Sequence, residues 1–170
     1  MVILRAKTRL LCLLFAFVLT LTSCSNKDVR DYREYGFCAR VIHVNGGTEA
    51  EADIFVEAPS AEGERKMRIE LTYPESLSGI VLCCDGGERY ILCGEMRLED
   101  TGFEYLFEWF NILLPTGELK VTGKCELSGT YALGALTDEC EIYLDISTHS
   151  PKEIRKGDKS IKFKSFSEDI

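Results

Sequence analysis

The sequence is poor in the residues and motifs from which catalytic and metal sites are built. Its 170 residues include only two histidines. His43 and His149 accompany neither a nucleophile nor a metal-ligand motif, so we interpret both as ordinary surface residues. The lack of a Cys-x-x-Cys pair excludes the usual redox pair and zinc knuckle. There is also no Walker A loop and no dinucleotide-binding fingerprint. We therefore expect no enzymatic activity, no metal and no cofactor.

Basic residues are also in the minority. The chain has 20 Lys and Arg against 28 Asp and Glu, which gives a formal net charge of −8. Three of the basic residues lie in Met1–Arg9, which holds no acid, so the remainder is more acidic still. Such a surface repels phosphate backbones and anionic lipid headgroups. We expect no nucleic-acid partner, and any membrane attachment needs a source other than charge.

The N-terminus has the layout of an export signal. Leu10–Leu21 follows the basic start and is almost wholly apolar. It has the length of a signal-peptide core and is too short for a membrane-spanning helix, which is the alternative interpretation. The run ends in Leu21-Thr22-Ser23-Cys24, which resembles a bacterial lipobox, where signal peptidase II cleaves before a lipid-modified cysteine. The resemblance implies a signal peptide at 1–23 and a lipid on Cys24.

A lipid on Cys24 determines the expected location. Each buried methylene contributes about 0.8 kcal/mol, and two acyl chains together hold a protein stably at a membrane. We therefore expect an exported protein anchored to the outer face of the cell membrane. Residues 24–35 are polar and charged without an apolar period, and we interpret them as a tether. Residues 36–170 have the length of a single domain, which we expect to be a monomer.

The chain has eight cysteines. Cys12 belongs to the leader and Cys24 to the lipobox, and the other six are Cys38, Cys83, Cys84, Cys93, Cys125 and Cys140. An even number in an exported chain allows up to three disulfides, whose pairing the sequence does not specify. The neighbours Cys83 and Cys84 point to opposite faces of a strand, which disfavours a shared metal. We expect structural thiols or disulfides.

From Gly36 onwards the dominant pattern has a period of two, which is typical of strands with one buried face. It is clearest in Ala50–Ala58, Met67–Tyr73 and Leu119–Leu127. Glycine-rich turns such as Asn45-Gly46-Gly47 separate successive strands. The pattern predicts about nine strands in an antiparallel meander with a polar outer face. A large sheet of this kind twists and curls.

One helix is predicted, at residues 101–114. Thr101 and Glu104 form a capping box, and Pro115 ends the helix. One face carries Phe103, Leu106, Phe107, Phe110, Leu113 and Leu114, and the other side is interrupted by Tyr105, Trp109 and Ile112. A helix that is apolar on nearly all sides must be covered on nearly all sides. We therefore predict an α+β fold, a curled antiparallel sheet wrapped around one central helix. A two-sheet sandwich would leave part of that helix uncovered.

Several of these features occur together in a known group. They are the lipobox, the Pro74-Glu75-Ser76-Leu77-Ser78-Gly79 step, the Asp85-Gly86-Gly87 hairpin, the central helix and the closing Ser150-Pro151…Ile154…Ile161-Lys162-Phe163 pattern. In this the chain resembles small lipoproteins of Gram-positive anaerobes, which are similar in layout to the lipoprotein-localisation-factor superfamily (LolA/LolB/LppX-like). The resemblance implies an incomplete antiparallel barrel with helices in its concave face, which holds acyl chains or other hydrophobic ligands.

Two functions are compatible with the apolar helix. In the first, the protein binds or carries a lipid, an acyl chain or another hydrophobic small molecule, with Tyr105, Trp109 and Ile112 as ligand-binding residues. In the second, it is a structural or protein-interaction lipoprotein whose helix fills its own core without a ligand. Phe107 and Phe110 are core residues in both. A cavity of several hundred Å3 between helix and sheet favours the first function, and dense packing favours the second.

Overall fold

The computed structural model describes residues 29–99, 102 and 104–169. The predicted signal peptide and Cys24 lie outside this range. The strands of the described residues are β1 (Gly36–Asn45), β2 (Thr48–Val56), β3 (Lys66–Tyr73), β4 (Ile80–Asp85), β5 (Glu88–Cys93), β6 (Met96–Glu99), β7 (Lys120–Leu127), β8 (Thr130–Leu136), β9 (Glu141–Leu144), β10 (Pro151–Lys156) and β11 (Lys159–Asp169). Its helical segments are the 3-10 turns η1 (Tyr32–Glu34), η2 (Glu75–Leu77) and η3 (Glu104–Phe107) and the α-helix α2 (Glu108–Leu113).

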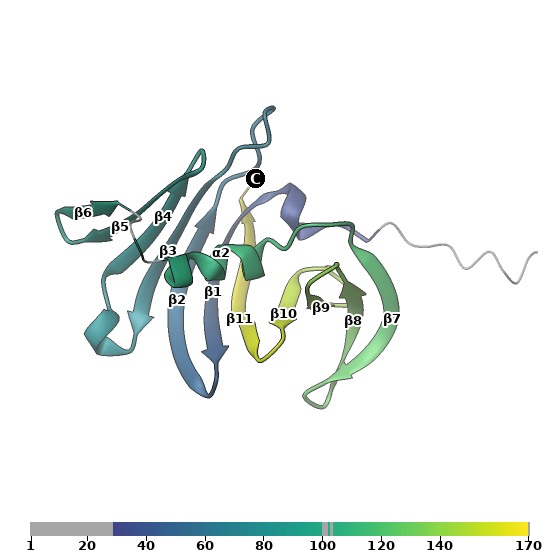
Figure 1. Ribbon diagram of the computed structural model, residues 1–170. Coiled ribbons are helices and arrows are strands. Elements are labelled where there is room, and N and C mark those ends of the chain that lie inside the picture. The colour runs from purple at the N-terminus through teal and green to yellow at the C-terminus, as the bar shows by residue number, and fades with distance from the viewer. Residues whose placement is uncertain (1–28, 100–101, 103, 170) are drawn as a thin grey trace, which may run out of the picture.

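All eleven strands form one antiparallel sheet in the order β6-β5-β4-β3-β2-β1-β11-β10-β9-β8-β7. Neighbours in the sheet are neighbours in the sequence, except that the first strand pairs with the last. The sheet curls, and α2 lies across its concave face (Figure 1). The expected curled antiparallel sheet with a helix in its concavity is therefore confirmed.

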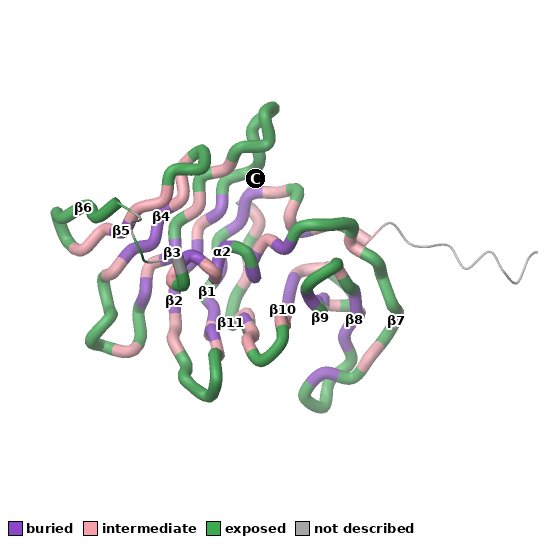
Figure 2. The backbone as a smooth tube through the Cα atoms, viewed as in Figure 1, coloured by how far each residue is buried: buried purple, intermediate pink, exposed green. Residues whose placement is uncertain are grey.

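The period-two pattern explains which face is buried. On β1 the inward residues Phe37 and Val41 are fully buried, whereas Cys38 and Arg40 between them point outward and are exposed. The register of β1 against β11 shifts between Arg40 and Val41, and such a bulge increases the local twist of a strand. Buried residues lie on strands either side of α2 (Figure 2). The concave face and its helix form the core.

The strand count differs from the prediction of about nine. Strand β6, whose four residues are all exposed, is absent from the predicted strands. Its side chains carry no burial signal, because β6 lies at the edge of the sheet and extends beyond the helix (Figure 1). Its hydrogen bonds to β5 make it a strand, and the pattern of apolar residues does not report those bonds.

The helix is shorter than the predicted 101–114. The segment Glu104–Phe107 is a 3-10 turn, and only Glu108–Leu113 is α-helical. Apolar spacing of three and four residues suits both hydrogen-bonding patterns, and 3-10 turns are frequent at the start of α-helices. Leu114 ends the helix with a non-helical ψ of 68° because the residue before a proline avoids the helical region. Thr101 and Phe103 lie outside the described residues.

The end of η3 and the α-helix α2 pack into the core. Phe107, Ile112 and Leu113 are fully buried and Phe110 is nearly so, whereas Leu106 and Leu114 are half-buried. The rings of Phe107 and Phe110 stack with their centroids 5.8 Å apart. These residues fill the core themselves, as the second of the two functions requires; we call that function the plug hypothesis.

The segment before β1, which the sequence analysis assigns to the tether, holds the far end of the helix. Tyr32 is buried, and its hydroxyl donates a hydrogen bond of 2.8 Å to the carbonyl oxygen of Leu113. Asp31 caps η1 by accepting from the backbone N–H of Arg33. The Arg33 guanidinium in turn donates to the Gly117 carbonyl oxygen at 3.0 Å. These bonds satisfy carbonyl groups at and just beyond the helix end, where intrahelical partners are lacking.

The six cysteines of the described residues are all free thiols. No disulfide therefore forms among them, although their even number allows up to three. Cys83 and Cys84 lie on β4, opposite Arg68 and Met67 of β3. Met67 and Cys84 pack against the core, whereas Arg68 is exposed, which confirms that the two neighbouring cysteines point to opposite faces. Burial raises the pKa of the Cys83 and Cys140 thiols, so both are protonated at neutral pH.

Within residues 29–99, 102 and 104–169, no helix has the length and apolar character needed to cross a bilayer.

Candidate ligand-binding cavity

A cavity of about 340 Å3 lies between the helical segment and one half of the concave face. Its lining comes from β1 to β4, from η2 and from the helical segment: His43, Asn45, Thr48, Ala50, Leu71, Leu77, Leu82, Tyr105, Leu106, Glu108 and Trp109. Small-molecule sites typically have volumes of roughly 300–1,000 Å3 and mostly apolar walls. This cavity lies at the small end of that range, which suits one slender ligand.

The helical segment has two sides with different roles. Tyr105, Leu106, Glu108 and Trp109 line the cavity, and their spacing of three and four residues places them on one side. Phe107, Phe110 and Leu113 lie on the other side, in the core. The segment is therefore a plug on one side and a cavity wall on the other.

The three predicted ligand-binding residues occupy different environments. Tyr105 lines the cavity and is 68% exposed, so it stands at the mouth. Trp109 also lines the cavity and is only 6% exposed, so it forms an inner wall. Ile112 is fully buried in the core and is not part of the lining. The structure thus brings Tyr105 and Trp109 together at the cavity.

The interpretation of His43 as an ordinary surface residue is wrong. Its side chain is 7% exposed, and its ring lies tilted by 35° against the Trp109 ring, with the two ring centroids 4.4 Å apart. Its Nε2 atom is buried without a hydrogen-bond partner. His43 lies at even spacing from the buried Phe37 and Val41 on β1, and this period of two is the feature of the sequence that could have indicated its burial.

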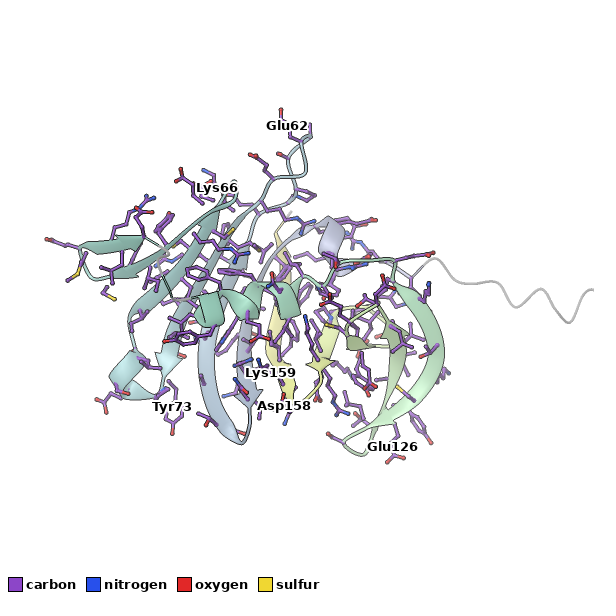
Figure 3. The ribbon with its side chains drawn as sticks, viewed as in Figure 1. Glu62, Lys66, Tyr73, Glu126, Asp158 and Lys159 are labelled. Carbon is purple, nitrogen blue, oxygen red and sulfur yellow. The ribbon has the colours of Figure 1, made fainter. Side chains whose placement is uncertain are left out.

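Burial, more than the charges around it, keeps the His43 ring neutral. The pKa of His43 is lowered from 6.5 to about 4, first by burial and then by the positive charge of Lys159, whereas the negative charge of Glu108 opposes the shift. Glu108 on α2 and Lys159 at the start of β11 form an ion pair. Figure 3 shows Lys159 below α2. The cavity therefore contains a neutral imidazole beside a paired carboxylate at neutral pH.

Polar and apolar groups occupy different parts of the lining. His43, Asn45 and Thr48 come from β1 and β2 beside their connecting turn. The leucines Leu71, Leu77 and Leu82 come from β3, η2 and β4, further along the sheet. In the described part of the chain, no cluster of three His, Cys, Asp or Glu side chains could hold a metal ion. The arrangement is suited to non-covalent binding of an apolar molecule.

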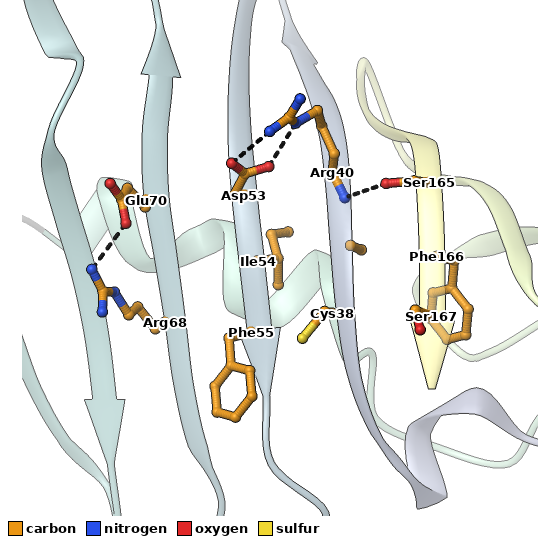
Figure 4. Close-up of a pocket in the computed structure, with 11 residues that line it drawn as sticks. Cys38, Arg40, Asp53, Ile54, Phe55, Arg68, Glu70, Ser165, Phe166 and Ser167 are labelled. Atoms are coloured by element: carbon orange, nitrogen blue, oxygen red, sulfur yellow. Dashed lines mark hydrogen bonds and ion pairs between the residues drawn. The ribbon is translucent and has the colours of Figure 1, made fainter. Parts of the chain in front are cut away.

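A larger hollow of about 640 Å3 lies on the outer face of β1, β2, β3 and β11 (Figure 4). Its charged groups are paired with one another. Arg40 donates to Asp53 at 2.7 and 2.9 Å, and Arg68 donates to Glu70 at 2.9 Å. Both pairs are about half exposed to solvent, where such pairs contribute little energy. Since these four lining charges already have partners, none of them calls for a ligand, and we place the candidate site in the concave face.

Comparisons with known proteins give structural matches. No family model matches the sequence, and no curated protein matches it significantly. An uncharacterized conserved protein from Thermus thermophilus is 15% identical, with a TM-score of 0.52 over 80% of this chain and 80% of that chain. A chain of the MucA/MucB complex of Pseudomonas aeruginosa is 12% identical, with a TM-score of 0.46 over 81% of this chain and 53% of that chain. This chain likewise spans about half the length of the chain in a crystal structure of MucB.

A third match is the LolA superfamily protein NE2245 from Nitrosomonas europaea, which is 6% identical, with a TM-score of 0.37 over 82% of this chain and 88% of that chain. The protein shares its fold, a curled antiparallel sheet around a short helix, with the Thermus protein.

Proposed function

We propose that this protein is a non-catalytic binder or carrier of a hydrophobic small molecule, such as a lipid or an acyl chain. The observation that supports this function is the cavity of about 340 Å3 between helix and sheet. Four leucines, Trp109 and Tyr105 give it the largely apolar wall that such ligands need. The ligand enters past the exposed Tyr105 and lies against Trp109.

The structural or protein-interaction function has one observation in its favour. Phe107, Phe110 and Leu113 are packed into the core and do not line the cavity, as the plug hypothesis requires. That packing involves only one side of the helical segment. The side with Trp109 faces unfilled volume, and we therefore favour ligand binding.

Filling the cavity provides the test. Ala50 lies directly opposite His43 in the β1–β2 pairing and lines the cavity. In Ala50→Phe the added ring occupies the volume that a ligand needs. We expect the affinity for N-phenyl-1-naphthylamine, a neutral apolar dye, to fall about tenfold or more, which corresponds to about 1.4 kcal/mol. The unfolding midpoint should change little, because the ring enters empty space.

The matched control is Ala61→Phe, which adds the same ring at an exposed position outside the cavity. It should leave dye binding unchanged. If Ala50→Phe bound the dye as tightly as the wild type, the cavity would not be the binding site. A wild type that binds no apolar ligand would instead support the plug hypothesis.

We also propose that the protein acts at the outer face of the cell membrane, held there by a lipid on Cys24. The support is the Leu21-Thr22-Ser23-Cys24 sequence after an apolar core. Two acyl chains are sufficient for stable attachment.

In Cys24→Ser, we expect radiolabelled palmitate incorporation to disappear and the protein to leave the membrane fraction or to remain unprocessed. The control is Cys38→Ser, because Cys38 lies on β1 in the folded domain. Palmitate labelling of Cys24→Ser at the wild-type level would contradict the proposal.

A further inference from the structure

The charge that lines the cavity is negative. Among the described lining residues only Glu108 is charged at neutral pH, because the His43 ring is neutral there. The cation that pairs with Glu108 is Lys159, which does not belong to the lining. In the outer hollow, by contrast, both members of each ion pair line the wall, so their charges cancel. The cavity therefore presents a carboxylate to the molecule that enters it.

The Glu108 carboxylate is accessible and has unused acceptor capacity. Its side chain is 33% exposed, so a molecule in the cavity can reach it. A carboxylate offers about four acceptor positions on its two oxygens, and Lys159 donates to only one of these oxygens, Oε2. Water satisfies the other positions of an exposed carboxylate, and a ligand that carries a donor can replace that water.

Glu108 lies at the polar end of the lining. Its partner Lys159 is directly opposite Asn45 in the β1–β11 pairing, and Asn45 is opposite Thr48 in the β1–β2 pairing. Asn45 and Thr48 both line the cavity. The part formed by β3, η2 and β4 is lined by three leucines, Leu71, Leu77 and Leu82. A molecule with a polar head at Glu108 and an apolar chain along the leucines matches this division.

Aromatic rings lie on the same side of the helical segment as the carboxylate. Tyr105 belongs to η3 and precedes Glu108 by three residues, a spacing at which side chains of a 3-10 turn lie nearly above one another. Trp109, four residues after Tyr105, also lines the cavity. The face of an aromatic ring attracts a cation within about 6 Å of its centroid. A carboxylate beside such rings suits an ammonium group and repels a phosphate or a second carboxylate.

We propose that the cavity takes an amphipathic ligand with a primary ammonium head, such as a long-chain amine, whose ammonium group is hydrogen-bonded to the Glu108 carboxylate. This inference rests on the proposed function, because it specifies the ligand of the same cavity. An ammonium group has three donors and no acceptor, so it forms strong charge-assisted hydrogen bonds to a carboxylate. The formal net charge of −8 further favours the approach of cations over that of anions.

Three probes with ten carbon atoms differ only in the head group. Decylamine is protonated at neutral pH like a lysine side chain, 1-decanol is uncharged, and decanoate is negative. Trp109 is the only tryptophan of the chain and lines the cavity, so its fluorescence reports binding to the purified full-length protein. We expect decylamine to bind more tightly than decanoate. The quantity to compare between variants is the ratio of the dissociation constants of decylamine and decanol, because the head groups differ in hydration.

The double variant Glu108→Gln/Lys159→Gln removes the carboxylate and its partner together and leaves the net charge unchanged. We expect its preference for decylamine over decanol to fall about tenfold, with decanol binding retained. Lys159→Gln alone leaves the carboxylate unpaired and should raise that preference. The matched control is Glu139→Gln/Lys156→Gln, which removes another Lys–Glu ion pair outside the cavity and should leave the ratio unchanged.

The outcomes separate this inference from the proposed function. If decylamine and decanol both bound the wild type and their ratio stayed the same in the Glu108→Gln/Lys159→Gln variant, the ammonium head would lie elsewhere and this inference would be wrong. A wild type that preferred decanoate to decylamine would contradict it as well. If no probe bound the wild type at all, the proposed function itself would fail, and the inference with it.

A measurement on the wild type alone does not depend on whether a variant folds. Decylamine should shift the 13C resonance of the Glu108 carboxylate, and decanol should leave it nearly unchanged. A carboxylate resonance that ignored bound decylamine would overturn the inference and leave the proposed function standing.

Discussion

Replacing Phe107 by alanine should lower the free energy of unfolding by about 3–5 kcal/mol, because the structure around a removed core ring closes only in part. The Phe107 side chain is fully buried and stacks on Phe110 at 5.8 Å. The Arg89 guanidinium carbon lies 5.8 Å from the ring centroid, so the ring also loses this contact. Urea unfolding followed by circular dichroism measures the change.

Trp109→Ala provides the informative comparison. Trp109 is buried as deeply as a core residue, but it borders the cavity and therefore has fewer packed atoms on that side. We expect Trp109→Ala to lower the free energy of unfolding clearly less than Phe107→Ala does, and to weaken binding of the dye N-phenyl-1-naphthylamine. Tyr105→Ala is the control for stability. Because the Tyr105 side chain is 68% exposed, its removal should leave the free energy of unfolding almost unchanged. Equal losses for Trp109→Ala and Phe107→Ala, with no apolar ligand bound by the wild type, would support the plug hypothesis.

The strands could be predicted from the sequence wherever burial follows the pleat. On β2, Ala52, Ile54 and Val56 are all buried, and they alternate with residues that face outward. The pattern fails where the ladder is irregular. Tyr73 follows Ile69 and Leu71 at a spacing of two residues but is 55% exposed, because the register of β2 against β3 shifts between Glu51 and Ala52 and pairs Tyr73 with the outward Glu51. The period of two does not report such a shift in strand pairing.

The site could be predicted only in part for the same reason. Helical spacing identified Tyr105 and Trp109 as surplus apolar surface, and both line the cavity. The same spacing grouped Ile112 with them, although Ile112 is fully buried in the core, next to Leu113, whose carbonyl oxygen accepts a hydrogen bond from Tyr32. His43 has an inward position in its strand, but its orphaned Nε2 depends on Trp109 covering the ring. The burial of Ile112 and the unpaired Nε2 of His43 depend on packing between segments far apart in the sequence. Neither the strand period nor the helix period carries information on such packing.

Acid should destabilise the folded protein through His43 between pH 6.5 and about pH 4. The pKa of His43 in the folded protein, about 4, lies below the unfolded value of 6.5. Between these two pH values the unfolded chain therefore binds a proton at His43 that the folded protein does not bind. The stabilising contribution is complete above pH 6.5 and is lost as the pH falls through this window. The difference between the two pKa values corresponds to about 3 kcal/mol.

His43→Phe isolates this contribution, because the variant has no proton to gain at this position. We expect the wild type and the variant to differ in their unfolding free energies by an amount that grows by up to about 3 kcal/mol from pH 7 to pH 4. Carboxylates with lowered pKa values, such as Asp31 and Asp53, titrate below this window and are common to both proteins. Urea titrations at several pH values measure the difference. A difference that stayed constant across this range would mean that the His43 ring takes up a proton in the folded protein as easily as in the unfolded chain, which its burial against Trp109 and beside Lys159 opposes.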